Sequence, residues 1–183
     1  DLGGSQVTDA GLVHLGSMPQ LISLDLSNTQ ITDAGLSRLN GYGQLRSLIL
    51  DDTQITDAGL VHLEEMTELL NLQISKTRVT DAGLRYLAGV IKLRSLGVVG
   101  LPITDHGLAH LKRKTNLVEL DLSQTNVTDA GLIHLRRLTN LRSLTLRDTQ
   151  ITDDGLVHLK PLHLLGELHL DGTSISDRGL VHL

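Results

Sequence analysis

Apolar residues recur along the chain with two spacings that alternate. Leu24 and Leu26 are two residues apart, which is the period of a β-strand whose side chains point to alternate faces. Leu36 and Leu39 are three residues apart, which is helical spacing. This pattern predicts a short strand, a loop and a helix of two or three turns, in that order.

The strand–loop–helix pattern repeats every 24 residues without insertion or deletion. Its marker is a Thr-Asp or Ser-Asp dipeptide, which begins at residues 8, 32, 56, 80, 104, 128, 152 and 176. The full unit reads LxxLxLxxTxITDAGLxxLxxLxx. One unit has too few apolar side chains to form a core alone, so we expect the units to stack and share one continuous core.

The unit resembles the leucine-rich repeat, whose pattern is LxxLxLxxN/CxL, and the ITDxGLxxL half is similar to the ribonuclease-inhibitor and F-box-associated branch and to bacterial arrays. The resemblance covers the whole chain and implies an α/β fold, a curved right-handed solenoid. Strands pair at ~4.8 Å and helices are ~10 Å wide, so the parallel sheet should line the concave face and the short helices the convex face. The chain departs from the family at the loop position, where it has Thr, as in Thr29, or Leu101.

We expect residues 1–183 to form a single solenoid of seven 24-residue repeats plus a partial repeat. Neither end of the sequence carries a distinct polar cap, which repeat arrays need for solubility. We therefore expect the chain to be a segment of a longer array, or its uncapped ends to contact another molecule.

Three repeated columns of small or polar residues are predicted to have structural roles. The Gly column, as in Gly35, should allow close approach of backbone between repeats. The loop Thr column should bond to backbone in the next repeat, as the family's Asn ladder does. The Asp column, from Asp9 to Asp177, suggests helix capping rather than calcium binding, because it lies at the helix starts.

Composition narrows the possible functions. The chain has no Cys, which excludes disulfides and thiolate zinc sites, and no Phe or Trp. Its net charge is −5, so a nucleic-acid partner is not expected. No apolar run approaches the ~20 residues of a membrane span, so no membrane partner is expected either. The sequence does not indicate a compartment.

Histidine is the first candidate for chemistry, because one helix column contains six of them. Metal binding requires closer convergence than splayed helices offer, so we expect no metal and no cofactor. Basic residues follow three helices and can meet an acidic partner or simply be solvated. The fourth repeat is irregular at Gly97–Pro102, where drift with repacking and a local partner contact both remain open. The histidines are His14, His62, His110, His134, His158 and His182, and the basic residues are Lys112, Arg113, Lys114, Arg136, Arg137 and Lys160.

No isolated carboxylate pair, phosphate loop or Ser–His–Asp arrangement interrupts the repeat, so we do not expect an enzyme. The favoured function is a protein-interaction or scaffolding module that binds a partner protein on its concave face. An architectural spacer and a targeting appendage of a separate enzyme domain are the alternatives. The expected partner-binding residues are Asp25, Arg46, Ile49, Gln73, Arg94, Glu119, Asp121, Arg142, Thr145 and His169.

Overall fold

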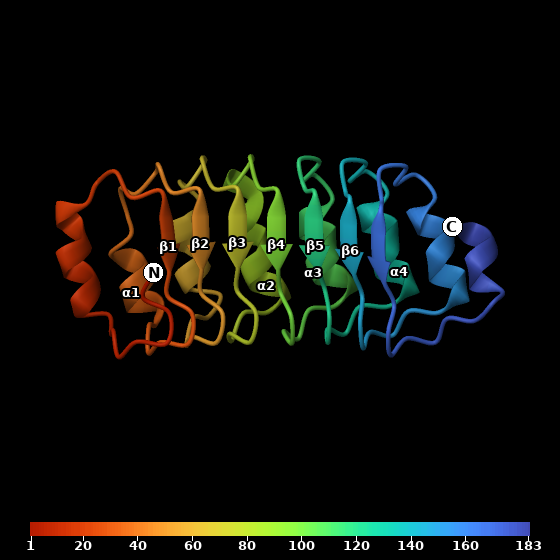
Figure 1. Ribbon diagram of the computed structural model, residues 1–183, viewed down its shortest axis with the longest axis horizontal. Coiled ribbons are helices and arrows are strands. Elements are labelled where there is room, and N and C mark those ends of the chain that lie inside the picture. The colour runs from red at the N-terminus through yellow and green to blue at the C-terminus, as the bar shows by residue number, and fades with distance from the viewer.

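The sheet of this protein is one row of seven parallel strands in sequence order, in a computed structural model that describes residues 1–183 (Figure 1). Each strand pairs with the next through residues 24 positions apart, so Leu24 lies opposite Leu48 and Leu48 opposite Leu72. The predicted repeat length therefore sets the register of the sheet. The strands are β1 Ser23–Asp25, β2 Ser47–Ile49, β3 Asn71–Gln73, β4 Ser95–Gly97, β5 Glu119–Asp121, β6 Ser143–Thr145 and β7 Glu167–His169.

Short helical segments cover one side of the sheet. The predicted helices of two or three turns are present at about that length in five repeats and are shorter in the other three, and several segments are 3-10 helices, which wind more tightly than α-helices. None of them is long and apolar enough to cross a membrane. The α-helices are α1 Asp33–Ser37, α2 Asp81–Leu84, α3 Asp105–Leu111 and α4 Asp129–Leu132. The 3-10 helices are η1 Gly11–Ser17, η2 Gly59–Leu63, η3 Arg85–Gly89, η4 Ile133–Leu135, η5 Asp153–Leu159 and η6 Gly179–His182.

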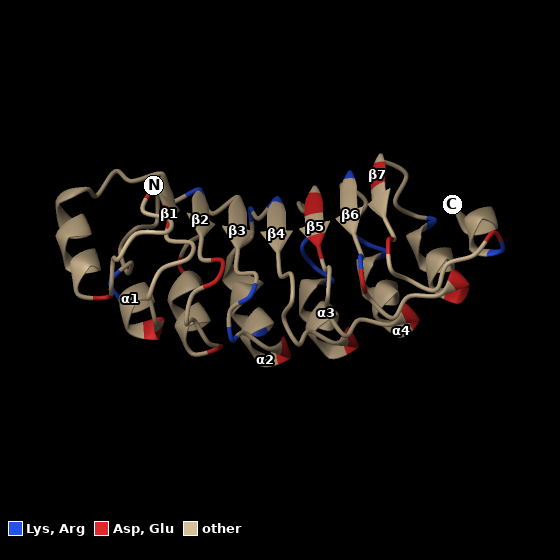
Figure 2. Ribbon diagram, turned by 60° about the horizontal axis from the view of Figure 1, so that its bottom comes forward, with Lys and Arg blue, Asp and Glu red and all other residues tan.

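The molecule bends gently along its length. Figure 2 shows the helices on the outer side of a shallow arc and the strands on the inner side. This is the expected result of stacking wide helices behind closely spaced strands. Because 3-10 helices are slimmer, the outer row splays little and the sheet stays open.

A single core runs through all the repeats. It contains 42 buried apolar side chains, and Leu24 and Leu26 of the strand motif both point into it, as predicted. Helix residues such as Leu36 and Leu39 close the core from the other side and are fully buried. Apolar side chains are exposed at its two ends, among them Val13, Met18, Leu180 and Val181.

The Asp column joins neighbouring repeats, so the prediction that it caps helices is wrong. Asp33 accepts hydrogen bonds from the amide of Thr56 at 2.8 Å and from its hydroxyl at 2.6 Å, across the gap between repeats. The helix cap is the Thr of the dipeptide, because the hydroxyl of Thr32 accepts from the amide of Ala34. The carboxylate is drawn away from its own helix because the next repeat offers two donors at once.

The Gly and loop Thr columns also differ from expectation. A Cβ on Gly59 would meet the Asp33 carboxylate and Leu36, so the glycine makes room for side chains of the previous repeat rather than for backbone. The hydroxyl of Thr29 donates to the carbonyl of Leu26 in its own repeat at 2.6 Å, and not to the next repeat. The turn after each strand is tight enough to place a carbonyl three residues back within reach of the hydroxyl.

The irregular fourth repeat keeps the common backbone path by repacking. Leu101 replaces the loop Thr and is 1 % exposed, so its side chain belongs to the core. Gly100 adopts φ +71°, in the same column where Gln124 is held at φ +57°. The structure thus accounts for this segment by local packing.

Candidate functional site

The inner face of the arc presents the first and third residues of each strand, because the central leucine points toward the core. Most of the predicted binding residues occupy these outward positions, and the three arginines directly precede β2, β4 and β6. The outward residues are Asp25, Ile49, Gln73, Glu119, Asp121, Thr145 and His169, and the arginines are Arg46, Arg94 and Arg142.

Side chains of β2 to β5 form a connected line of hydrogen bonds across the inner face. Asn71 donates to the hydroxyl of Ser47 at 2.9 Å, and Gln73 donates to the side-chain oxygen of Asn71 at 2.7 Å. Gln73 also donates to the hydroxyl of Ser95 at 3.3 Å, and that hydroxyl donates to Glu119 at 3.1 Å. These bonds fix rotamers that would otherwise be free, so the face is ordered before any partner arrives.

A shallow hollow of about 350 Å³ lies on the inner face between β3 and β7, and residues of β4, β5 and β6 line it. Beside it Gly97 has no side chain, and Gln73 of the neighbouring strand occupies that space, because a Cβ on Gly97 would collide with the side chain of Gln73. The walls carry the carboxylates of Glu119, Asp121 and Glu167. Of the predicted residues, Gln73, Glu119, Asp121 and Thr145 meet at the hollow, while Asp25, Ile49 and Arg46 lie beyond it toward the N-terminal end.

Charges alternate along one rim of the inner face. Arg46, Arg94 and Arg142 are exposed, and none of them forms an ion pair. They directly precede β2, β4 and β6, while Glu119 begins β5 and Glu167 begins β7. Figure 2 shows blue segments at β4 and β6 and red segments at β5 and β7. The arginines are two strands apart, so they stand at a spacing of ~10 Å.

The carboxylates at the far end of the strands are held in fixed orientations. Asp25 accepts hydrogen bonds from the amide and hydroxyl of Ser27, and Asp121 accepts the same pair from Ser123. Burial raises the pKa of Asp51 above its usual value, with Asp25 adding a smaller effect of the same sign. One oxygen of Asp25 and one of Asp121 stay free for a partner.

His169 belongs to a different cluster at the C-terminal end of the sheet. A guanidinium nitrogen of Arg147 lies 3.2 Å from Nδ1 of His169, and Nε of Arg147 lies 2.8 Å from Asp171. The hydrogen bond from Arg147 lowers the pKa of Asp171 below its ordinary value. His169 is thereby drawn toward the loop edge and away from the hollow.

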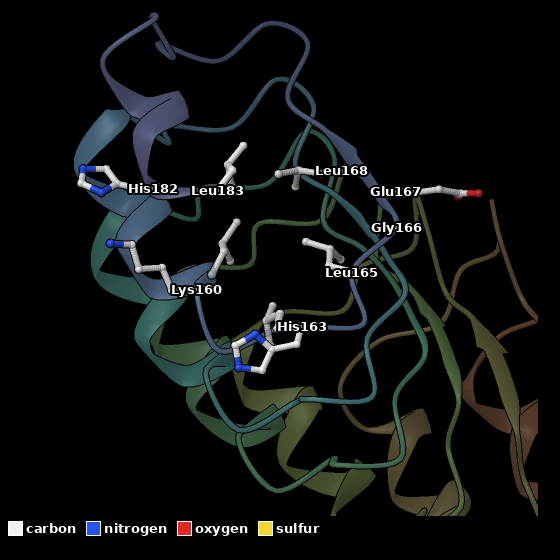
Figure 3. Close-up of a pocket in the computed structure, with 10 residues that line it drawn as sticks. Lys160, His163, Leu165, Gly166, Glu167, Leu168, His182 and Leu183 are labelled. Atoms are coloured by element: carbon white, nitrogen blue, oxygen red, sulfur yellow. The ribbon is translucent and has the colours of Figure 1, made fainter.

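A second hollow, of about 370 Å³, lies at the C-terminal end of the core (Figure 3). Leu165, Leu168 and Leu183 surround it, while Glu167 projects away toward the inner face. His163 and His182 reach its outer rim, but neither forms a side-chain hydrogen bond. The hollow therefore contains no histidine that is hydrogen-bonded to a carboxylate, the pair that acid–base catalysis commonly uses.

The helix histidines stand apart from one another on the outer side. His14 and His110 are exposed, and His62 and His134 are half-buried. No three His, Asp or Glu side chains in the chain converge as metal ligands would.

Sequence reasoning missed the role of Lys114. It was grouped with exposed basic residues, yet it is 6 % exposed and its ammonium donates to the carbonyls of Leu87, Ala88 and Val90 at 2.5, 3.1 and 3.0 Å. Burial lowers its pKa to about 8. The repeat did hold a clue, because Lys114 occupies the apolar column of Val90 and Leu138.

A family model described as leucine-rich repeat matches residues 18–39, 45–63, 113–135 and 137–160. Internalin C2 from Listeria monocytogenes strain 4b F2365 is a similar solved structure, with 28% sequence identity and a TM-score of 0.77. The similarity covers 96% of this chain and 71% of that chain. No curated protein sequence matches the chain. The finer resemblance to the ribonuclease-inhibitor and F-box-associated branch stays a prediction, but the repeat signature, the single parallel sheet and these matches together place the chain in the leucine-rich-repeat family.

Proposed function

We propose that the chain is a non-catalytic protein-interaction module that binds a partner protein on the inner face of the arc. The observation that carries this proposal is the connected hydrogen-bond line from Ser47 to Glu119, whose last residue lines the inner hollow. An ordered, concave and polar surface loses little side-chain entropy on binding, so more of the contact energy contributes to affinity.

The rim charges indicate what the partner must offer. Arg46, Arg94 and Arg142 call for carboxylates at ~10 Å intervals, and Glu119 and Glu167 call for cations between and beyond them. Arginine is also among the residue types that most often dominate binding energy at protein interfaces. A protein surface can present both signs of charge in a fixed pattern.

The side-chain contacts of the histidines and serines favour a binding role over catalysis. The only hydrogen bond made by a histidine side chain joins His169 to Arg147, so no carboxylate orients an imidazole. Ser47 and Ser95 on the inner face bond to Asn71, Gln73 and Glu119, and neither contacts a histidine. These serines are neither activated nor positioned as nucleophiles.

Site-specific photo-crosslinking in extracts of the source cells tests the proposal. A photoreactive residue at Thr145 faces the inner hollow, and one at Val61 lies on the outer helix side, where it is 40% exposed. We expect discrete crosslinked partners from Thr145 and none in common from Val61. Equal crosslinking from both positions, or none from Thr145, would favour an architectural spacer.

Substitution of the arginines on the rim provides a second, independent test of the proposal. Replacing Arg46, Arg94 and Arg142 with Ala should abolish the Thr145 adducts, because the rim loses its positive charges. Replacing the exposed Arg38, Arg78 and Arg178 removes the same charge from elsewhere and should leave the adducts unchanged. Adducts that survive the rim substitutions would exclude the arginines from the site.

A further inference from the structure

A third hollow, of about 610 Å³, lies on the helix side of the molecule, away from the inner face. It forms where the ends of α3 and η4 meet the loops that return to the sheet. Its walls carry the cationic side chains of Lys112, Arg113, Arg136 and Arg137. Ile133, which is 48% exposed, and Pro161 add apolar surface to the same hollow.

The fold does not require cations at these positions. The residues equivalent to Lys112 and Arg113 in the four preceding repeats are Gly16-Ser17, Asn40-Gly41, Glu64-Glu65 and Ala88-Gly89, and in the two following repeats they are Arg136-Arg137 and Lys160-Pro161. A positive charge does suit the C-terminal end of a helix, by ~0.3–1 kcal/mol. The same position after η2 holds two glutamates, so that effect is too weak to dictate the residue type.

The four cations lack partners within the chain. The only ion pairs are Lys92 with Glu68 and Arg147 with Asp171. The nearest repeated carboxylates, Asp105 and Asp129, are occupied by Thr128 and Thr152 of the following repeats. Four exposed like charges on adjacent turns repel one another, and a bound anion would relieve that repulsion.

We propose that this hollow binds an acidic segment of a partner protein, with carboxylates against the four cations and an apolar side chain against Ile133. Guanidinium groups bind carboxylates through two parallel hydrogen bonds. Neighbouring helices are ~8–10 Å apart and an extended peptide advances ~3.3 Å per residue, so carboxylates about three residues apart reach both cationic pairs.

A peptide fits the site better than a nucleic acid or an anionic membrane. The hollow joins only two helix ends, and the chain as a whole carries a net charge of −5, which repels a long polyanion. Bases would also need aromatic platforms, and no aromatic residue lines the hollow. The apolar surface of Ile133 and Pro161 matches a peptide that mixes acidic and apolar residues.

Fluorescence anisotropy with a labelled peptide of repeated Glu-Glu-Leu triplets tests the site at low salt. Replacing both Arg136 and Arg137 with Glu should weaken binding by at least about tenfold. The control replaces Arg38 and Arg78 with Glu, which changes the net charge equally and should weaken binding by less than about twofold. Circular dichroism checks that both variants fold, and Gln at the two positions replaces Glu if the first variant does not.

Two further comparisons distinguish this hollow from the inner face and a peptide ligand from other polyanions. Replacing Arg46, Arg94 and Arg142 with Ala should weaken peptide binding by less than the substitution of Arg136 and Arg137 does, because the rim arginines lie on the other face of the molecule. No binding of the peptide, or equal weakening in the test and control variants, would overturn the proposal. Tighter binding of oligothymidylate, or of phosphatidylserine–phosphatidylcholine vesicles, through Arg136 and Arg137 would overturn it in favour of a nucleic acid or a membrane.

Discussion

The carboxylate of Asp129 accepts two hydrogen bonds from Thr152 of the next repeat, one from the amide at 2.8 Å and one from the hydroxyl at 2.6 Å. The same relationship recurs between every pair of successive repeats, from Asp9 with Thr32 to Asp153 with Ser176. Each Thr hydroxyl also accepts from its own helix, as that of Thr152 does from Asp154. The repeats are therefore joined by a polar chain that runs beside the core.

Replacing Asp129 with Ala should destabilise the protein by about 2 kcal/mol. The substitution removes two hydrogen bonds to a charged acceptor and leaves the Thr152 amide without its partner. Urea denaturation followed by circular dichroism measures the loss. Asp154→Ala is the control, because that exposed carboxylate forms no hydrogen bond, and its effect should stay below about 0.5 kcal/mol. Similar losses in both variants would contradict the linking role of Asp129.

The sequence predicted the fold because one physical requirement dominates it. Leu24, Leu26, Leu36 and Leu39 can all be buried only when identical units stack, so the period of the leucines determines sheet, register and core together. The hydrogen-bond partners of Asp33 were not predictable in this way. A carboxylate at a helix start has donors in its own helix and in the next repeat, and only the three-dimensional stacking decides between them.

The sequence predicted which residues face the inner side of the arc, but not how their side chains contact one another. Alternation within a strand places Gln73 and Asp121 on the inner face, as the sequence indicated. The missing side chain of Gly97 leaves room for Gln73 to reach Ser95, and Gln73 and Ser95 both line the hollow. Side-chain rotamers of this kind follow from packing between repeats, which a one-dimensional pattern does not contain.

Replacing Gly131 with Ala should destabilise the protein, although Ala favours helices by ~1 kcal/mol. A Cβ at Gly131 would stand 3.1 Å from Cγ of Asp105 and 3.2 Å from a methyl group of Leu108. Relieving that contact must displace Asp105 from Thr128, with a net loss of about 1–3 kcal/mol in unfolding free energy.

A double-mutant cycle isolates the cause of this loss. When Asp105 is already Ala, the contact with the carboxylate is absent, so Gly131→Ala should become neutral or stabilising. Unfolding free energies of the four proteins, from urea titrations, give the coupling directly. Additive effects of the two substitutions would show that Gly131 serves some purpose other than accommodating Asp105.

The stability of the protein should rise with pH between about 8 and 10 because of Lys114. Its folded-state pKa is lowered by burial to about 8, whereas an unfolded lysine has an ordinary pKa near 10.5. Between these values the unfolded chain binds the proton more strongly, so folding releases it and higher pH favours the folded state. Below about pH 8 both states are protonated and this dependence disappears.

Comparison with Lys114→Met separates this effect from those of other titrating groups. The free energy of unfolding of the wild-type protein, relative to that of the variant, should increase by on the order of 2 kcal/mol from pH 7.5 to 10. Thermal denaturation over a series of buffers provides the measurement. A constant difference between the two proteins across this range would mean that the ammonium keeps its ordinary pKa.

Restoring the repeat pattern at Leu101 should weaken the protein. Leu101→Thr re-creates the loop hydroxyl, which can donate to the carbonyl three residues earlier as Thr125 does to Leu122 at 2.7 Å, a gain of ~1 kcal/mol. It also removes apolar atoms from a side chain that is 1 % exposed and leaves a cavity, a loss of ~2–3 kcal/mol. The net change should be a destabilisation of about 1–2 kcal/mol, read from urea denaturation midpoints.

The control is Thr125→Val, which removes the loop hydroxyl where the repeat pattern is intact. It should destabilise the protein by about 1 kcal/mol, and so it measures the contribution of the hydroxyl's hydrogen bond. Because the cavity term exceeds the hydroxyl term only if the fourth repeat has repacked around Leu101, an increase in stability on Leu101→Thr would show that the irregular segment is a defect rather than an alternative packing.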